Sequence, residues 1–166
     1  EKYNAINVIG IEADDLCAIA ANQYKNDYTV VVCSPDKDVL GTIPGKHYNY
    51  KSHQWITTTE YDSIKFMWLQ VLHGDATDGI IGLPGIGKVK AEKILLTGIL
   101  EEDPLDIQYS KMEMNVYKAY RNHYGDIHTG IFEYQKNFRL VYLLRNNENY
   151  KNECGSDLIL PEPFKI

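Results

Sequence analysis

The pattern of apolar and polar positions in the first third of the chain is typical of alternating strands and helices. Residues 28–33 (YTVVVC) form a continuous β-branched run of the kind that is buried on both faces of a sheet. A shorter apolar run at residues 5–10 and an amphipathic segment that opens at residue 13 come before it. These three segments predict a β-α-β unit with a parallel sheet.

The next segments change from strand-like to helical spacing. Residues 47–50 and 54–58 predict two short strands around a turn, and Thr59 is a candidate N-cap for the helix that follows. The apolar stripe of that helix is Ile64, Met67, Trp68, Val71 and Leu72. We therefore expect an α/β protein, with a sheet-containing segment over residues 1–73 and a helical segment over residues 74–166.

The second half of the chain contains start and stop signals of helices. Pro104 follows Asp103 as an N1 proline after a cap, and Gly125 resembles a helix stop. Residues 131–144 predict a last amphipathic helix. We expect the polar, then proline-rich tail at residues 146–166 to wrap around the protein rather than fold by itself.

Composition narrows the class of protein. With 166 residues, 44% of them hydrophobic, the chain can build one ordinary core or two small lobes. A net charge of -6 argues against a generic DNA-coating protein, which is usually basic. It does not exclude a nuclease, because metal-binding carboxylates make a metal-free protein acidic.

Cysteine usage and hydropathy bear on the compartment. The three cysteines have no Cys-x-x-Cys spacing and are odd in number, which argues against a disulfide scaffold or a zinc site and favours a reducing compartment. No apolar run approaches the roughly 18 residues of a membrane span. We expect a cytoplasmic protein that does not bind membranes and is a monomer.

Acidic residues gather in three clusters, each at a predicted element boundary. Taken singly, each pair is more easily read as helix caps or solvated turn residues, but three such clusters together favour a metal site. In an open α/β sheet the carboxyl ends of the strands meet at one edge, and two divalent cations about 3.5–4 Å apart can serve phosphodiester cleavage there. The candidate ligands are Glu12, Asp14 and Asp15, then Asp36 and Asp38, then Asp75 and Asp78.

A second motif begins directly after Asp78. Residues 80–94 (IIGLPGIGKVKAEKI) match a helix-hairpin-helix pattern, in which Gly85 and Gly87 allow positive φ and close backbone approach. Ile80, Leu83, Ile86 and Ile94 would pack the two helices, and Ala91 would let them cross closely. The N–H groups after Gly85, with Lys88 and Lys90, would bind phosphate without reading sequence. A purely structural turn is the alternative.

These residues support a family resemblance over about residues 8–96. EADD at 12–15, SPDKD at 34–38 and GDATD at 74–78 resemble, in order and spacing, the acidic motifs of the 5′-nuclease superfamily, which contains phage 5′→3′ exonucleases, flap endonucleases and the 5′-nuclease domain of bacterial DNA polymerase I. The closing segment at residues 138–147 (FRLVYLLRNN) is closer to the phage exonucleases than to cellular flap endonucleases. The resemblance implies a PIN-like sheet followed by a helix-three-turn-helix region, and a role in phage DNA replication or recombination.

The resemblance also implies roles for individual residues. Glu12 and Asp14 would hold one Mg²⁺ or Mn²⁺, and Asp36, Asp38 and Asp75 would hold a second. Asp14 would bridge the two ions, and Asp15 and Asp78 would lie in or beside the inner coordination shell. DNA would bind to Gly85, Ile86, Gly87, Lys88 and Lys90. A K⁺ ion would bind the backbone carbonyls of Gly82, Leu83 and Ile86.

Three functions are compatible with the sequence. The resemblance favours metal-dependent hydrolysis of DNA at a 5′ end or flap. The alternatives are a non-catalytic helix-hairpin-helix DNA-binding module and an α/β phosphohydrolase acting on small molecules, which would not need the hairpin. The chain begins at Glu1 in what reads like the middle of a domain. The family's N-terminal half carries two more aspartates and a basic arch, so we expect a longer intact protein and slow or absent cleavage by residues 1–166 alone.

Overall fold

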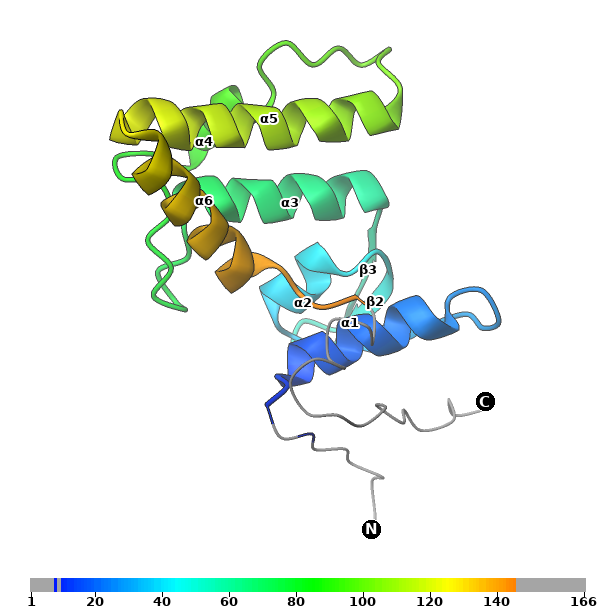
Figure 1. Cartoon of the computed structure of the whole chain (residues 1–166). Coiled ribbons are helices and arrows are strands. Elements are labelled where there is room, and N and C mark those ends of the chain that lie inside the picture. Colours follow the sequence, from blue (N-terminus) through cyan, green and yellow to red (C-terminus); the bar gives the residue numbers. More distant parts are fainter. Residues whose placement is uncertain (1–7, 9, 146–166) are drawn as a thin grey trace. The chain divides into compact units, whose positions relative to one another are not determined.

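The computed structural model describes residue 8 and residues 10–145. The chain forms two compact units, whose elements are labelled in Figure 1. The sheet unit comprises the described residues up to Thr58 together with Leu143–Arg145, and the helical unit comprises Thr59–Tyr142. The division falls earlier than the expected one at residue 73, because the helix after Thr59 packs with the later helices. The catalytic and DNA-binding roles of the two segments stay predictions.

The sheet unit is an α/β structure with a mixed sheet, which confirms the predicted class. Its strands lie in the order β1-β2-β3, with β1 parallel to β2 and β2 antiparallel to β3. The predicted strand at residues 5–10 falls mostly outside the described residues, so the β-α-β unit through the first helix stays a prediction. The described elements of this unit are α1 (Ala13–Tyr24), β1 (Val31–Cys33), α2 (Lys37–Thr42), β2 (Gly45–Asn49) and β3 (Gln54–Thr58).

The first strand is shorter and more exposed than its sequence suggested. Only Val31–Cys33 of the run at 28–33 forms a strand, and Val31 and Cys33 are exposed on either side of half-buried Val32. Successive side chains of a strand point to opposite faces. Val32 packs on the small core that α1 and α2 supply, whereas the neighbouring side chains face outward. The expectation of burial on both faces was therefore wrong for the described part of this unit.

The β2–β3 hairpin confirms the two predicted strands. Its register pairs Tyr48 with Trp55, and the Asn49 carboxamide oxygen accepts hydrogen bonds from the Lys51 and Ser52 amides in the connecting turn. On the inner face, His47 is fully buried, and its Nε2 lies 2.8 Å from the Ile43 carbonyl oxygen.

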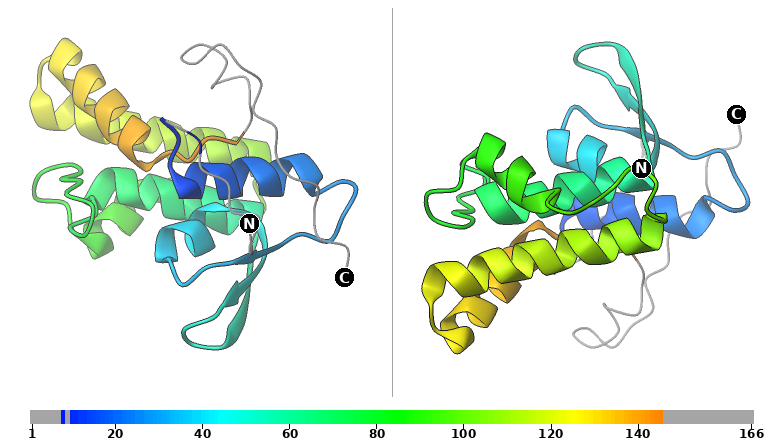
Figure 2. Two further views of the ribbon diagram at one scale, coloured as in Figure 1. Left: turned by 90° about the horizontal axis from the view of Figure 1, so that it is seen from below. Right: turned by 90° about the horizontal axis from the view of Figure 1, so that it is seen from above.

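The helical unit has a core of its own. Figures 1 and 2 show α5 alongside α3, with α4 and α6 packed against them. Trp68 of α3 stacks on Tyr134 and Phe138 of α6, with ring centroids 6.1 and 5.4 Å apart. Buried Met112, Val116 and Tyr120 fill the α5 side. The helices are α3 (Glu60–His73), α4 (Lys88–Leu95), α5 (Leu105–Tyr124) and α6 (Ile127–Val141).

Two predicted helix boundaries of this unit are confirmed. Thr59 caps α3 in a capping box with Asp62: the Thr59 hydroxyl accepts from the Asp62 amide, and the Asp62 carboxylate accepts from the Thr59 amide. Gly125 ends α5 with a left-handed φ of 68°. Both boundaries rest on local chemistry, which is why the sequence reveals them.

Two other boundaries are corrected. Pro104 lies at the N-cap of α5 rather than at N1, because the Asp103 carboxylate accepts from the Leu100 amide and pairs with Lys111 instead of capping the helix. The last helix begins at Ile127, earlier than predicted, because Asp126 caps it by accepting from the Thr129 amide at 2.7 Å. It ends at Val141, so Leu144 lies beyond it.

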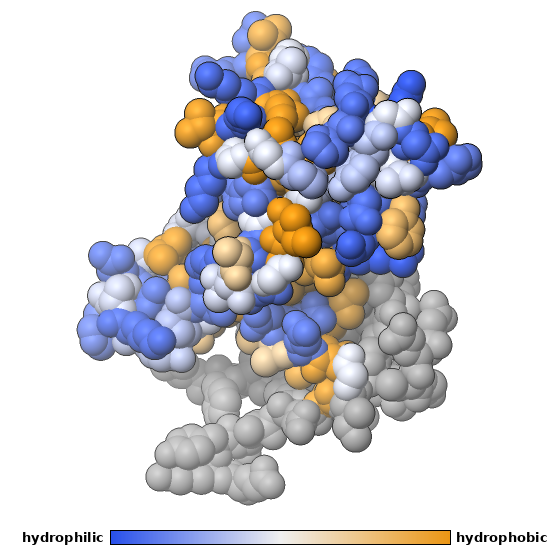
Figure 3. Space-filling view, turned by 90° about the vertical axis from the view of Figure 1, so that its left-hand side faces the viewer, coloured by the Kyte–Doolittle hydropathy of each residue, from blue (hydrophilic) through white to orange (hydrophobic). Residues whose placement is uncertain are grey.

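The surface is mainly polar on the face shown in Figure 3, where apolar residues are scattered in small groups. Among the described residues, no helix is both long enough and apolar enough to cross a membrane. The predicted tail at residues 146–166 lies outside the described part.

Candidate metal- and phosphate-binding residues

The first acidic cluster lies at the N-terminus of α1. Glu12 occupies the N-cap position and is exposed, but its side chain makes no capping hydrogen bond. Asp14 and Asp15 lie half-buried in the first turn. The Asp15 Oδ1 accepts a hydrogen bond of 2.8 Å from the Leu144 amide, which ties the chain after α6 to this helix. Asp15 therefore already has a structural role, while the Glu12 carboxylate is open to solvent.

The second cluster begins α2, a short helix that the sequence did not reveal. Asp36 is its N-cap and accepts from the Asp38 amide at 2.8 Å, while the Asp36 amide donates to the Ser34 hydroxyl at 3.0 Å. Asp38 is half-buried in the first turn, where the helix dipole favours a negative charge. As predicted, these acids directly follow the carboxyl end of a strand.

The two helices that carry these clusters pack together through Ala18 and Ala21 of α1, Val39 of α2 and Ile43 directly after α2. Within the sheet unit alone, however, no three carboxylates of described residues come close enough to hold one ion. The convergence of the two clusters around shared metal ions stays a prediction.

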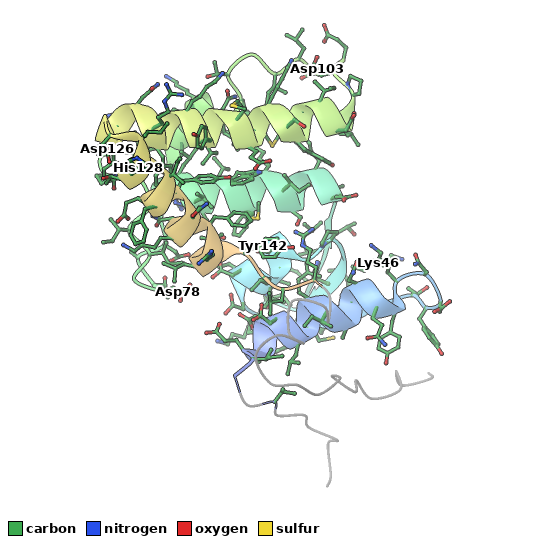
Figure 4. The ribbon with its side chains drawn as sticks, viewed as in Figure 1. Lys46, Asp78, Asp103, Asp126, His128 and Tyr142 are labelled. Atoms are coloured by element: carbon green, nitrogen blue, oxygen red, sulfur yellow. The ribbon has the colours of Figure 1, made fainter. Side chains whose placement is uncertain are left out.

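The third cluster lies on the loop after α3 in the helical unit. Asp75 is only 7% exposed; its Oδ2 accepts from Gln70 Nε2 at 3.3 Å and its Oδ1 from the Thr77 amide at 2.9 Å. Its backbone forms a two-bond antiparallel bridge with Ile80, with both N···O distances 2.8 Å. Asp78, on the turn within this bridge, is exposed (Figure 4). A buried, oriented carboxylate and an exposed one thus share a single loop.

Three carbonyl groups at the end of α3 accept hydrogen bonds from the helix's C-cap residue, from α5 and from the loop. Gly74 ends the helix with a positive φ of 74°, and its amide donates to the Gln70 carbonyl. The Val71 carbonyl accepts from the Tyr120 hydroxyl at 2.6 Å, and the Leu72 carbonyl accepts from the Leu83 amide at 2.8 Å. Gln70 and Tyr120 were not singled out from the sequence, because each looks like one more member of a helix face until its partner is known.

The glycine hairpin confirms part of the predicted motif and corrects part. Gly85 has a positive φ of 76°, as expected, but Gly87 has a φ of -89° and is the N-cap of α4. Residues 74–87 form the bridge and turns rather than a helix, so α3 is the helix before the hairpin. The predicted packing residues all belong to the helical core, with Leu83 and Ala91 buried and Ile80, Ile86 and Ile94 partly buried.

The N-terminus of α4 has the features of a phosphate site. Its Gly87 N-cap supplies no side-chain acceptor, and the first turn contains no acidic residue, so the first amides have no side-chain cap. Lys88 and Lys90 are exposed there, and the Lys90 ammonium lies 3.4 Å from the Gly85 carbonyl oxygen. Amides, dipole and lysines together favour an anion at this end of the helix.

Comparison with known proteins gives the family. No protein-family model matches the chain. It is 35% identical to the DNA polymerase I of Borreliella burgdorferi in a match over 125 residues that covers 68% of this chain. The chain belongs to the 5′-nuclease superfamily. The matched segment spans only 13% of that polymerase. Among solved structures, a mutant of T5 5′-exonuclease is 17% identical and aligns with a TM-score of 0.47 over 82% of this chain and 69% of its own.

Proposed function

We propose that the chain takes part in metal-dependent hydrolysis of DNA phosphodiesters at a 5′ end or 5′ flap. The observation that carries this proposal is the loop after α3. It places the buried Asp75 carboxylate one short bridge away from a glycine hairpin and an uncapped, lysine-bearing helix N-terminus. One motif supplies oxygen ligands for a hard cation and the other supplies donors for phosphate.

The donor set fits Mg²⁺ or Mn²⁺, which prefer carboxylate oxygens. Gln70 and Thr77 each donate a hydrogen bond to the Asp75 carboxylate, which orients it. When bound, such ions would lower the pKa of a water molecule and neutralise charge on the phosphate. The proposed ligands are Glu12 and Asp14 for one ion, Asp36, Asp38 and Asp75 for the other, and Asp15 and Asp78 in or beside the inner shell.

The hairpin would bind the backbone of the duplex. In this proposal Gly85 and Gly87 present amides to a phosphate, and Lys88 and Lys90 add positive charge; such contacts are independent of sequence. The predicted contact by the Ile86 amide is corrected, because that amide donates to the Leu83 carbonyl oxygen at 3.1 Å within the hairpin. The carbonyls of Gly82, Leu83 and Ile86 are the proposed K⁺ ligands. A PIN-like sheet, a setting in phage replication or recombination, a cytoplasmic location and a monomeric state stay predictions from the resemblance.

A double substitution separates an enzyme from a binding module. We expect slow Mg²⁺-dependent cleavage of a labelled 5′-flap DNA by residues 1–166, measurable under single-turnover conditions over long incubations. Asp36→Asn with Asp75→Asn should abolish that cleavage, while binding of the same DNA, measured by fluorescence anisotropy in Ca²⁺, should persist. If the unaltered chain binds the flap without cutting it, and the double substitution changes neither property, a non-catalytic DNA-binding module is the better description.

A further inference from the structure

The loop between Gly74 and Leu83 returns on itself more tightly than any side chain would allow. A Cβ on Gly82 would lie 2.3 Å from the Gly74 nitrogen, and a Cβ on Gly74 would lie 2.3 Å from the Ile80 carbonyl oxygen. Both glycines have positive φ, near 70°. The two ends of the loop are therefore in backbone contact, so a shift at Gly82 is transmitted directly to Gly74 and to the adjoining Asp75.

A side chain from α6 holds this contact point. The Gly82 amide is buried and donates to Asn137 Oδ1 at 3.1 Å, across 55 positions of sequence. Asn137 is only 3% exposed and lies within α6. The nearby Tyr134 and Phe138 of the same helix pack against the core. Burial of an asparagine at such a position is costly unless its polar atoms are satisfied.

The orientation of Asn137 is itself fixed. Its Nδ2 donates to the Glu133 carbonyl at 2.9 Å, one turn earlier in α6. Because the side-chain nitrogen of Asn137 donates within α6, its side-chain oxygen faces the loop and accepts from the Gly82 amide. The side chain thus joins the rigid frame of α6 to the loop that carries Asp75.

We propose that Asn137 is a positioning residue, which acts through the Gly82 amide to hold the Asp75 loop and the start of the hairpin in their metal- and phosphate-binding conformation. The expected effect on catalysis rests on the proposed function. The positioning of the loop by Asn137 does not depend on that function. Without the Asn137 acceptor, the Gly82 amide would be buried without this partner, and the loop would open locally to reach water.

The chain offers variants that separate positioning from general stability. Asn137→Leu removes both hydrogen bonds and keeps the branching of the side chain, with a larger volume. Asn137→Ser keeps a hydroxyl that can donate to the Glu133 carbonyl but is too short to reach Gly82. Gln108→Leu is the matched control, because Gln108 is also buried and its Nε2 donates to the Asp103 carbonyl at 2.7 Å, in the loop before α5.

Two readouts are measured on residues 1–166. By NMR, we expect amide exchange at Gly82 and Asp75 to rise about tenfold or more in both Asn137 variants, while α5 core amides change much less. In the cleavage assay, we expect the half-saturating Mg²⁺ concentration to rise several-fold, with a smaller change in rate at saturating Mg²⁺. Gln108→Leu should change neither the exchange at Gly82 nor the Mg²⁺ dependence.

Each outcome decides something. Unchanged exchange at Gly82 in Asn137→Leu, or an equal increase in Gln108→Leu, would overturn the positioning role. An increase at Gly82 with unaltered Mg²⁺ dependence would overturn its link to the metal site. If the unaltered chain shows no Mg²⁺-dependent cleavage, the proposed function is what fails, and the exchange data still decide the role of Asn137 in the loop.

Discussion

The Tyr120 hydroxyl caps a carbonyl that α3 cannot satisfy by itself. In a continuing helix the Val71 carbonyl would accept from the Asp75 amide, but that amide donates to Ile80 instead. Tyr120 is fully buried and donates to Val71 at 2.6 Å. Burial raises the pKa of its phenol far above the ordinary value of 10.0, so it stays protonated and donates throughout the neutral range.

Tyr120→Phe keeps the ring and removes only the donor. Leaving a buried acceptor without its partner costs about 1–3 kcal/mol, so we expect the free energy of unfolding of the helical unit to fall by about that amount. Tyr117→Phe is the control on the same helix: Tyr117 contacts the Tyr134 ring at a centroid distance of 5.8 Å, a contact that Phe preserves. Its effect should stay below about 0.5 kcal/mol.

Urea unfolding followed by tryptophan fluorescence measures the difference. Trp68 lies in the helical core, whereas Trp55 lies in the sheet unit and is 69% exposed, so a Trp55→Phe background makes the signal specific to the helical unit. We expect a lower midpoint with an unchanged slope. If the urea midpoints of the Tyr120→Phe and Tyr117→Phe variants agree within experimental error, the Tyr120 hydroxyl does not stabilise the end of α3.

Three further predictions follow from individual residues. Gly82→Ala should destabilise the helical unit by about 2 kcal/mol or more beyond Gly98→Ala, since both have positive φ but only Gly82 lacks room for a Cβ; the same urea assay decides, and equal costs would contradict the close approach. Burial lowers the pKa of His47 below its ordinary value of 6.5, against an opposing hydrogen bond to a carbonyl. As pH falls, His47 therefore binds its proton at a higher pH in the unfolded chain than in the folded protein. Stability of the sheet unit should decline below pH 6.5, by at most about 1.4 kcal/mol per pH unit, and His47→Gln should remove that part of the decline; amide exchange of β2 measures it, and identical pH profiles would contradict it. Lys88→Ala with Lys90→Ala should weaken duplex binding equally for unrelated sequences and reduce the slope of log K against log salt by about 2, measured by anisotropy; an unchanged slope would exclude phosphate contacts by these lysines.

Local chemistry accounts for what the sequence could predict. Thr59 caps α3 with a residue three positions away, and Gly125 ends α5 through its own φ, so both boundaries are visible in a short window. Likewise, the positive φ of Gly85 depends on neighbouring residues and was predicted correctly.

Long-range contacts account for what the sequence could not predict. The sequence of α6 gives no indication that Asn137 accepts a hydrogen bond from the Gly82 amide. The sequence of α5 likewise gives no indication that the Tyr120 hydroxyl donates to a carbonyl of α3. The Asp103 side chain binds Leu100 and Lys111 instead of capping α5, a choice that depends on the fold of the loop. Half-exposure of β1 also depends on which of its faces the helices cover.

Paramagnetic line broadening detects binding of a divalent cation to the acidic clusters, whether or not the chain cleaves DNA. Substoichiometric Mn²⁺ is added to residues 1–166, and amide resonances are compared with those of the Asp75→Asn variant. We expect early broadening confined to residues near 12–15, 36–38 and 75–78, and loss of the broadening near 75–78 in the variant. Broadening spread evenly over the acidic surface, or an identical pattern in Asp75→Asn, would contradict this expectation.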